Sequence, residues 1–323
     1  MNPICILKEQ IKNGYLLTKK EALELSTAPL KELCTAANEI RLHFCGNAFD
    51  ICTIINGKSG KCSENCKFCA QSAFYPTTLE EYPLLSQETI VEHAKYNDER
   101  GVLRYSIVTS GKKLSNTEVD HVCEAALAIK KESKINLCAS LGLLDEEQFR
   151  KIKAAGITRI HNNLETSKRY FSKVCTTHTF EDKIKAIHEA QRAGLNVCSG
   201  GIMGLGETME DRIDMVLTIR ELGIRSIPVN MLNAIAGTPF EHLPRLTNED
   251  MCRIVALFRF LVPNASIRLA GGRGLLEDKG KACFLSGANA AISGDMLTTA
   301  GITIEQDMRL LKELGYKVVL WNE

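Results

Sequence analysis

Three cysteines lie close together in the stretch KSGKCSENCKFCAQS, residues 58–72. Cys62, Cys66 and Cys69 are separated by three and then two residues. Structural zinc sites take four protein ligands, commonly from paired C-x2-C units, so the uneven triplet fits zinc poorly without excluding it. A ferredoxin loop would have the spacing C-x2-C-x2-C and a distant fourth cysteine before a proline, which this stretch lacks. Three thiolates on a 4Fe-4S cluster would leave one iron open to a substrate or cofactor.

The surroundings of the triplet indicate where it lies. Charged residues interrupt it (Lys61, Glu64 and Lys67), which favours a surface or the mouth of a cavity over a core. It follows an apolar, β-branched run at 49–56, on the C-terminal side of a predicted strand, where the active sites of barrels lie. Three unrelated structural thiols would be the alternative, which the short spacing disfavours. The triplet therefore predicts a metal centre at an active-site mouth.

The elements that must position this loop follow an alternating pattern from about residue 48 to about residue 300. Short apolar runs, turns and amphipathic helical segments recur in that order. The eight runs are 49–56, 103–110, 135–142, 157–165, 195–204, 226–232, 266–271 and 288–294. Strands that alternate with helices indicate a parallel sheet, and eight units favour a (β/α)8 TIM-type barrel over a doubly wound open sheet.

The two ends of the chain fall outside this pattern. Two helices are expected in the first 43 residues, at 18–27 and 30–44, as a helical lead-in to the barrel. We therefore divide the chain into N-terminal helices packing on the barrel (1–45), the barrel (46–300), and a C-terminal helix and tail (301–323). No long linker, charge block or low-complexity segment in the sequence indicates a further domain.

Six of the runs carry a polar or soft side chain. A barrel interior is ordinarily filled by branched apolar residues, and burying Asn or Arg without partners costs a few kcal/mol each. If the six point inward, they form a ring that binds a polar ligand or an inorganic cluster; if they point outward, the helices satisfy them. They come in order from the second to the seventh run: Ser106, Cys138, Asn163, Cys198, Asn230 and Arg268.

Composition limits the class of partner. The chain has 323 residues, of which 40 are basic and 39 acidic, giving a net charge of +1. Such a balance attracts neither nucleic acid nor an anionic membrane, so we expect a small-molecule partner. The N-terminus lacks the pattern of a secretory signal and no apolar run reaches a membrane span, which predicts a cytoplasmic protein. Its thirteen cysteines should then remain thiols.

The triplet, with Phe68 before its last cysteine, resembles the signature of the radical S-adenosylmethionine superfamily. Further stretches resemble the biotin synthase family from about residue 38 to 316. They include HNNLETS, CTTHTFEDK, VCSGGIMGLGET, PVNML, SIRLAGGR and SGANAAISGDMLTT. The resemblance implies that a 4Fe-4S cluster on Cys62, Cys66 and Cys69 cleaves S-adenosylmethionine, that the 5'-deoxyadenosyl radical abstracts hydrogen from dethiobiotin, and that an auxiliary iron-sulfur cluster, 2Fe-2S or a variant, donates sulfur to give biotin. It also implies an electron-donor protein such as flavodoxin or ferredoxin, and a homodimer.

The resemblance assigns roles to further residues. Cys138 and Cys198 match cysteine ligands of the auxiliary cluster, and Arg268 matches its arginine ligand. Asn163 and Glu165 match positions near the cofactor ribose and the substrate, although the family often has Asp in place of Glu165.

Catalytic and cofactor positions follow from the same motifs. Asn230 matches a substrate contact, so Asn163 and Asn230 are the expected catalytic residues. Gly201, Gly204 and Gly206 would let the backbone approach the cofactor, although glycines after a strand often form only a turn.

Ser106 departs from the family pattern, which has a cysteine in this strand. A serine hydroxyl is a harder ligand than a thiolate and has a far higher pKa. Three interpretations stay open: ligation by serinate, replacement by another cysteine, or a differently built cluster. Cys52, on the adjacent predicted strand, is the best substitute if it points inward, and a packing residue if it does not.

The remaining cysteines are assigned to no metal site, and two other functions compete with the one that the resemblance implies. Helix faces are predicted to bury Cys34, Cys123, Cys252 and Cys283, whereas Cys5, Cys45 and Cys175 have no predicted role. One rival is a related radical enzyme without sulfur insertion, which predicts a second site that donates no sulfide. The other is a non-catalytic iron-sulfur or zinc-binding protein, which predicts no binding of S-adenosylmethionine.

Overall fold

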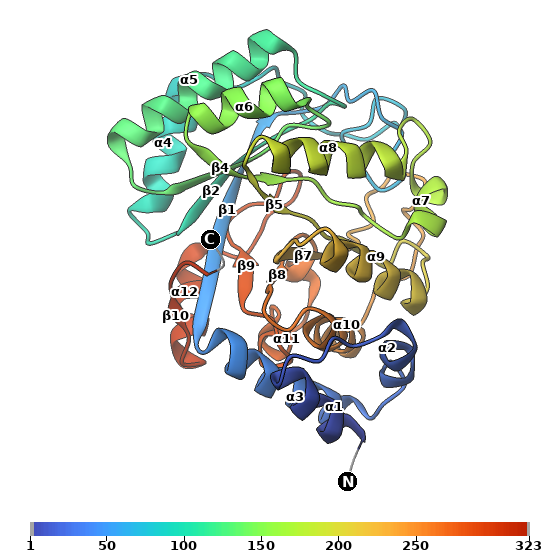
Figure 1. The fold of residues 1–323 in the computed structure, drawn as a ribbon. Helices are drawn as coiled ribbons and strands as arrows, with labels where there is room; N and C mark the ends of the chain where they lie inside the picture. Colours follow the sequence, from blue (N-terminus) through green and yellow to red (C-terminus); the bar gives the residue numbers. More distant parts are fainter. Residues whose placement is uncertain (1–2, 322–323) are drawn as a thin grey trace.

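The computed structural model describes residues 3–321 and shows a closed barrel of parallel strands (Figure 1). The strands follow one another around the barrel in chain order, and β9 pairs with β1, so the sheet closes on itself. The predicted (β/α)8 barrel is confirmed, and closure excludes the open sheet. The strands are β1 (Ala48–Lys58), β2 (Arg104–Thr109), β3 (Asn136–Ser140), β4 (Ile157–His161), β5 (Asn196–Cys198), β6 (Gly201–Met203), β7 (Ser226–Met231), β8 (Ser266–Leu269) and β9 (Ala290–Ile292).

The fifth strand position is split into β5 and β6, where the sequence predicts one continuous run. Both segments pair with β7. At the break, a Cβ added to Gly200 would lie 1.9 Å from the carbonyl oxygen of Pro228. The neighbouring strand therefore passes so close that only glycine fits, and the ladder is interrupted there.

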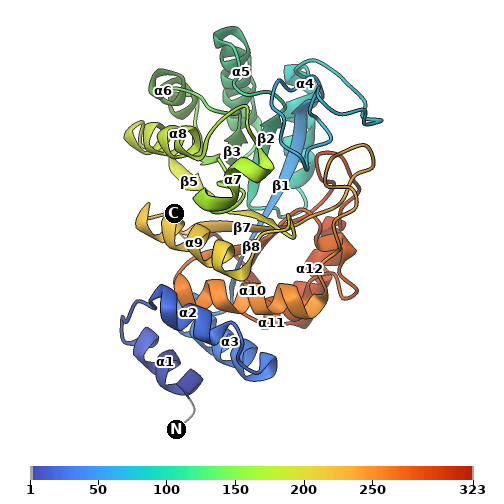
Figure 2. The ribbon, with the colours of Figure 1, turned by 90° about the vertical axis from the view of Figure 1, so that its right-hand side faces the viewer.

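Helices cover the outside of the barrel (Figures 1 and 2). Most begin at a Ser, Thr or Asp whose side chain accepts a hydrogen bond from the first turn, as Thr247 does at the start of α10. Their buried faces complete the core against the strands. They are α4 (Gln87–Asp98), α5 (Asn116–Glu132), α6 (Glu146–Ala154), α7 (Lys168–Val174), α8 (Phe180–Arg192), α9 (Met209–Glu221), α10 (Asn248–Leu261), the 3-10 turn η1 (Arg273–Leu275) and α11 (Lys281–Leu285).

Three helices precede the barrel, one more than predicted: α1 (Pro3–Lys12), α2 (Lys19–Leu25) and α3 (Leu30–Cys45). Only Ile4 and Ile11 of α1 are buried, which leaves little periodic signal in its sequence. Helix α3 packs against α1 and α10 (Figure 2). At the other end, α12 (Ile304–Glu313) leads to β10 (Lys317–Val318), which pairs with β1. Within residues 3–321, no helix has the length and apolarity needed to cross a membrane.

Side chains alternate along β1 between the lumen and the surrounding helices. Phe49 packs outward against the rings of Phe284 and Tyr316. Asp50, in the opposite direction, contacts buried arginines from β2 and β8. Ile54 lines the cavity described below. Because side chains two residues apart share a face, Cys52 between Asp50 and Ile54 points into the lumen.

Candidate active site

The three-cysteine loop belongs to the segment 59–86, which connects β1 to α4. Backbone hydrogen bonds fold the loop on itself: Cys62 N donates to Gln71 O over 3.0 Å, Ala73 N to Cys62 O over 2.9 Å, and Cys69 N to Cys66 O over 3.0 Å. All three cysteines are partly exposed. The three cysteines therefore lie on a compact loop at the C-terminal end of β1, as predicted from the sequence.

A cavity of about 340 Å³ opens beside this loop. Its walls come from the C-terminal ends of the strands, including Ile54, Val108, Ser140, His161, Ala270 and Ile292. Cys69 and Phe68 of the loop line it as well. Of the predicted site residues, Asn163, Glu165 and Asn230 also lie on its wall. Residues distant in the sequence thus meet at one pocket, as the barrel topology requires.

Two asparagines on the cavity wall are held in place by backbone groups. Asn163 Oδ1 accepts a hydrogen bond from Gly200 N over 3.1 Å. Asn230 Oδ1 accepts from Gly271 N over 2.9 Å, and its Nδ2 donates to Gly201 O over 3.1 Å. Asn163 lies beyond the end of β4, in the following loop, so the prediction of a ring formed entirely by strand residues is wrong at this position.

Glu165 occupies an unusual backbone position, with φ 68°. Burial raises the pKa of its carboxyl group, against the opposing charges of Lys183 and His178. One carboxylate oxygen, Oε2, is buried without a hydrogen-bond partner among the described residues. A buried acceptor without a partner is costly, so this wall of the cavity is suited to a ligand that carries hydroxyl donors.

The three predicted glycines lie beside the cavity wall but are absent from its lining. A Cβ on Gly201 would lie 2.3 Å from the carbonyl oxygen of Glu165. Gly204 and Gly206 have φ values of +97° and +92°, which other residues rarely adopt. Backbone geometry therefore accounts for these glycines, and their approach to a cofactor stays a prediction.

Three thiols lie in the lumen, one residue layer below the cavity. Cys52, Cys138 and Cys198 are all buried. Cys52 and Cys138 each lie two residues before a residue that lines the cavity, and Cys198 pairs with His161, which also lines it. Ser106 pairs with Cys138 and is fully buried. Its hydroxyl has no hydrogen-bond partner within residues 3–321. The polar interior predicted for these strands is therefore real, and it includes Cys52.

Charged residues surround these thiols. Asp50 lies 2.9 Å from Arg104 Nε and 3.2 Å from Arg268 Nη2, and Arg159 acts on the same carboxylate. Although burial opposes ionisation, Arg268 and Arg104 hold the pKa of Asp50 below its usual value. Three guanidinium groups and one carboxylate give a local excess of two positive charges. Such an excess favours thiolates and an anionic group between them.

The thiols respond differently to this environment. Burial opposes the ionisation of Cys198, yet the charge and hydrogen bond of His161, together with Arg268 and Arg159, lower its pKa to about 6. Burial raises the pKa of Cys138 against the pull of Arg159 and Arg104, and burial with the neighbouring Cys138 raises that of Cys52. Cys198 is therefore the thiol most readily available as a ligand.

These donor sets fit two iron-sulfur clusters. The loop offers three thiols on one turn beside the cavity, and the lumen offers three thiols, a hydroxyl without a partner and an excess of positive charge. Sequence reasoning overlooked Asp50, Arg104 and Arg159. The signal that could have revealed them is a charged residue near the start of an apolar, β-branched run.

Cys175 is a further residue to which the sequence gave no role. It directly follows the last residue of α7, and its thiol forms a hydrogen bond with Cys66 of the loop. The hydrogen bond from Cys66, then that from His178, lowers the pKa of Cys175 to about 3, against the effect of burial. No local spacing could have signalled this contact, because more than a hundred residues separate the two cysteines.

The sequence matches two family models. The model of the Radical SAM superfamily matches residues 58–219. The model described as the Biotin and Thiamin Synthesis associated domain matches residues 228–317. Together they extend from the three-cysteine loop to β10.

Relatives and solved structures agree with these matches. Biotin synthase from Brachyspira hyodysenteriae is 64% identical over 97% of this chain and 94% of its own length. Biotin synthase from Akkermansia muciniphila is 58% identical over 97% of both chains. In structure, methylornithine synthase superposes with a TM-score of 0.86 over 97% of both chains at 21% identity. The FeFe-hydrogenase maturase HydG from Carboxydothermus hydrogenoformans reaches 0.82 at 17% identity, over 97% of this chain and 78% of the maturase. At these identities the two structures show the shared fold alone.

Proposed function

Because the chain belongs to the biotin synthase family of radical S-adenosylmethionine enzymes, we propose that it inserts sulfur into dethiobiotin in the cavity between the three-cysteine loop and the thiols of the lumen. When bound, the 4Fe-4S cluster with S-adenosylmethionine supplies the 5'-deoxyadenosyl radical, and the auxiliary cluster supplies the sulfur. The protein's own residues hold these groups, orient the substrate between them and exclude water.

The loop side of the cavity holds the first cluster and the cofactor. Cys62, Cys66 and Cys69 would be the three thiolate ligands, which leaves one iron for S-adenosylmethionine. Asn163 and Glu165 would bind the cofactor ribose. Support comes from the free carboxylate oxygen of Glu165, which can accept a hydrogen bond from a ribose hydroxyl.

The walls of the cavity position and protect the substrate. Apolar side chains at strand ends, such as Ile54, Val108 and Ile292, keep water from a reactive carbon radical. The amide of Asn230 is fixed by two backbone hydrogen bonds and would orient a polar group of dethiobiotin. A side chain that is already ordered loses little conformational entropy when the substrate binds.

The lumen would hold the auxiliary cluster on Cys52, Cys138 and Cys198, with Arg268 as a fourth ligand. Cys52 would take the role that the family gives to a cysteine at the position of Ser106. Its support is its inward orientation and its electrostatic proximity to Cys138. A thiolate binds iron better than a serine oxygen, whose proton is far harder to remove. The excess positive charge would balance the anionic cluster.

One observation carries the proposal: Cys69 of the three-cysteine loop lines the cavity, and three further thiols lie one layer beneath its floor. A substrate in it would lie between the source of the radical and the source of sulfur. An electron-donor protein such as flavodoxin or ferredoxin, a homodimeric assembly and a cytoplasmic location belong to the same proposal.

The test is an anaerobic reaction. The protein is reconstituted with iron and sulfide, then mixed with dithionite, S-adenosylmethionine and dethiobiotin, and 5'-deoxyadenosine and biotin are quantified by mass spectrometry. We expect both products, and neither from Cys62→Ala. Formation of 5'-deoxyadenosine without biotin would point to a related radical enzyme without sulfur insertion. Absence of both products from fully reconstituted protein would overturn the proposal.

A further inference from the structure

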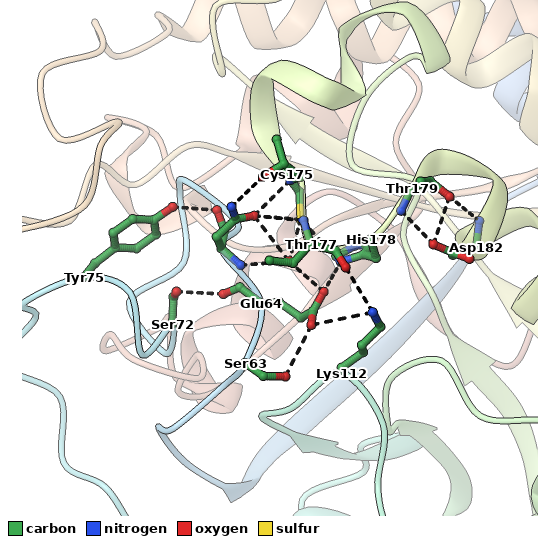
Figure 3. Close-up of polar contacts among 12 residues, drawn as sticks. Ser63, Glu64, Ser72, Tyr75, Lys112, Cys175, Thr177, His178, Thr179 and Asp182 are labelled. Carbon is green, nitrogen blue, oxygen red and sulfur yellow. Dashed lines mark hydrogen bonds and ion pairs between the residues drawn. The ribbon is translucent and has the colours of Figure 1, made fainter.

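Cys66 of the three-cysteine loop lies close to Cys175 and His178, and His178 contacts Glu64; none of these side chains lines the cavity. Figure 3 shows Cys175, His178 and Glu64. The thiols of Cys66 and Cys175 and a ring nitrogen of His178 lie within 4.8 Å of one another. His178 Nδ1 lies 3.3 Å from Cys175 Sγ and 2.5 Å from Glu64 Oε2. Cys175, His178 and Glu64 are each more than nine-tenths buried. Two sulfurs and one imidazole nitrogen therefore lie close together in a largely closed space, with a carboxylate oxygen of Glu64 beside the imidazole.

We propose that Cys66, Cys175, His178 and Glu64 form a mononuclear site for a borderline divalent transition-metal ion, Fe²⁺ or Zn²⁺, when the loop carries no cluster. The inference rests on the proposed function, because Cys66 is also a proposed ligand of the 4Fe-4S cluster. Thiolate, imidazole and carboxylate are the ligands that such ions take in four-coordinate sites.

The donor spacing is close to that of a tetrahedral site. With metal–sulfur bonds of about 2.3 Å and metal–nitrogen bonds of about 2.0 Å, neighbouring donors lie about 3.3–3.8 Å apart. The two thiols and the imidazole nitrogen lie within 4.8 Å of one another, whereas Glu64 Oε2 and His178 Nδ1 lie only 2.5 Å apart. Side-chain rotations that move the donor atoms by about 1 Å would complete the site. A metal ion would replace the hydrogen bonds that join His178 to Cys175 and to Glu64.

Hydrogen bonds from the flanking residues hold the donor side chains in position. Asn65 Oδ1 accepts from the backbone nitrogens of Thr176 over 2.9 Å and Thr177 over 3.2 Å, and its Nδ2 donates to Thr176 Oγ1 over 2.7 Å. Thr177 Oγ1 donates to Glu64 Oε2 over 2.8 Å. Figure 3 shows the contact between Thr177 and Glu64, which joins the loop to the segment after α7. Ligands oriented by such outer contacts bind a metal more tightly than free side chains do.

Cys66 makes the two states of the loop mutually exclusive. It belongs to both donor sets, whereas Cys62 and Cys69 belong only to the cluster and Cys175 only to the mononuclear site. An ion held by Cys66 and Cys175 occupies a thiol that the cluster needs. Fe²⁺ bound there would be stored beside the loop on which the cluster is assembled. Zn²⁺ bound there would block cluster assembly.

The experiment titrates Co²⁺ into anaerobic, cluster-free full-length protein and records the visible absorption of tetrahedral, thiolate-bound Co²⁺. We expect one ion per chain, with two sulfur ligands by X-ray absorption. Cys175→Ala and His178→Gln should each weaken binding at least tenfold. Cys62→Ala is the matched control, because it removes a loop thiol outside the four donors and should leave the titration unchanged. Circular dichroism checks that every variant is folded.

The outcomes separate the two proposals. Equal Co²⁺ binding by Cys175→Ala and the unchanged protein would overturn the mononuclear site, as would loss of binding in Cys62→Ala, which places the ion on the cluster loop. Competition with Fe²⁺ and with Zn²⁺ then identifies the ion held more tightly. Cys175→Ala reconstituted with iron and sulfide should still show the electron paramagnetic resonance signal of the reduced 4Fe-4S cluster. Its loss in Cys66→Ala but not in Cys175→Ala would support the proposed cluster ligands independently of the Co²⁺ result.

Discussion

Arg268 on β8 is held by Asp50 on β1, across the strand that closes the barrel. Its Nη2 lies 3.2 Å from the Asp50 carboxylate, and its Nη1 donates to the carbonyl oxygens of Asp50 over 3.0 Å and Ala291 over 3.1 Å. Both side chains are buried. The position of the proposed arginine ligand therefore depends on an aspartate that would touch no cluster.

Asp50→Asn should destabilise the cluster-free protein by about 3–5 kcal/mol, because it removes the negative charge from beside two buried guanidinium groups. Urea denaturation followed by circular dichroism gives the free energy of unfolding. Glu210→Gln is the control, since Glu210 pairs with Lys19 at 2.8 Å on an exposed surface and should contribute less than about 1 kcal/mol. A loss below 1 kcal/mol for Asp50→Asn would contradict the buried pair.

The same carboxylate predicts how stability depends on pH. Because the pKa of Asp50 is lower in the folded chain, the unfolded chain binds more protons near pH 4, and stability rises with pH in that range. The stabilisation is complete above about pH 5 and is lost as the pH falls through the folded pKa. In urea titrations from pH 7 to pH 3, the advantage over Asp50→Asn should stay constant and then narrow below pH 5. A constant difference throughout would show that Asp50 is not the titrating group.

Cys52→Ala should remove the auxiliary cluster, whereas Ser106→Ala should retain it, because a buried thiolate is the stronger iron ligand. Iron content and Mössbauer spectra of the reconstituted variants measure this directly, with the cluster on the three-cysteine loop as the internal reference. Biotin formation should fall at least tenfold in Cys52→Ala while 5'-deoxyadenosine still forms. The reverse pattern would establish ligation by serinate.

Glu165→Ala should weaken the binding of S-adenosylmethionine at least tenfold. The substitution removes a carboxylate whose free oxygen can accept a hydrogen bond from the ribose, and a charged hydrogen bond contributes about 1.5–3 kcal/mol. Anaerobic calorimetry on protein that carries the 4Fe-4S cluster measures the dissociation constant. Glu277→Ala, at an exposed position outside the cavity, should leave it unchanged. Equal affinities for the two variants would remove Glu165 from the cofactor site.

The period of the apolar runs was sufficient to predict the barrel, because every run became a strand position. Length was harder to predict: the run at 195–204 broke at Gly200, where β7 passes too close for any side chain. Helix α1 was missed because it buries only two residues. Local sequence patterns thus predict helices and strands well, and they fail where contact with a distant segment determines the end of an element.

The candidate site divides in the same way. The triplet, Asn163, Asn230 and the polar strand residues could be found from the sequence, because type and spacing reveal them. The inward orientation of Cys52 needed the register of β1, and the contact between Cys66 and Cys175 joins loops that are remote in the sequence. Such contacts depend on the folded chain and leave no periodic trace.

The seam between β1 and β9 has a consequence for biosynthesis. These two strands come from opposite ends of the barrel sequence, so the ring cannot close before Ala290 has left the ribosome. Until then the lumen has no complete wall around its thiols. A cluster bound among them would therefore have its full enclosure only after the last barrel strand has been synthesised.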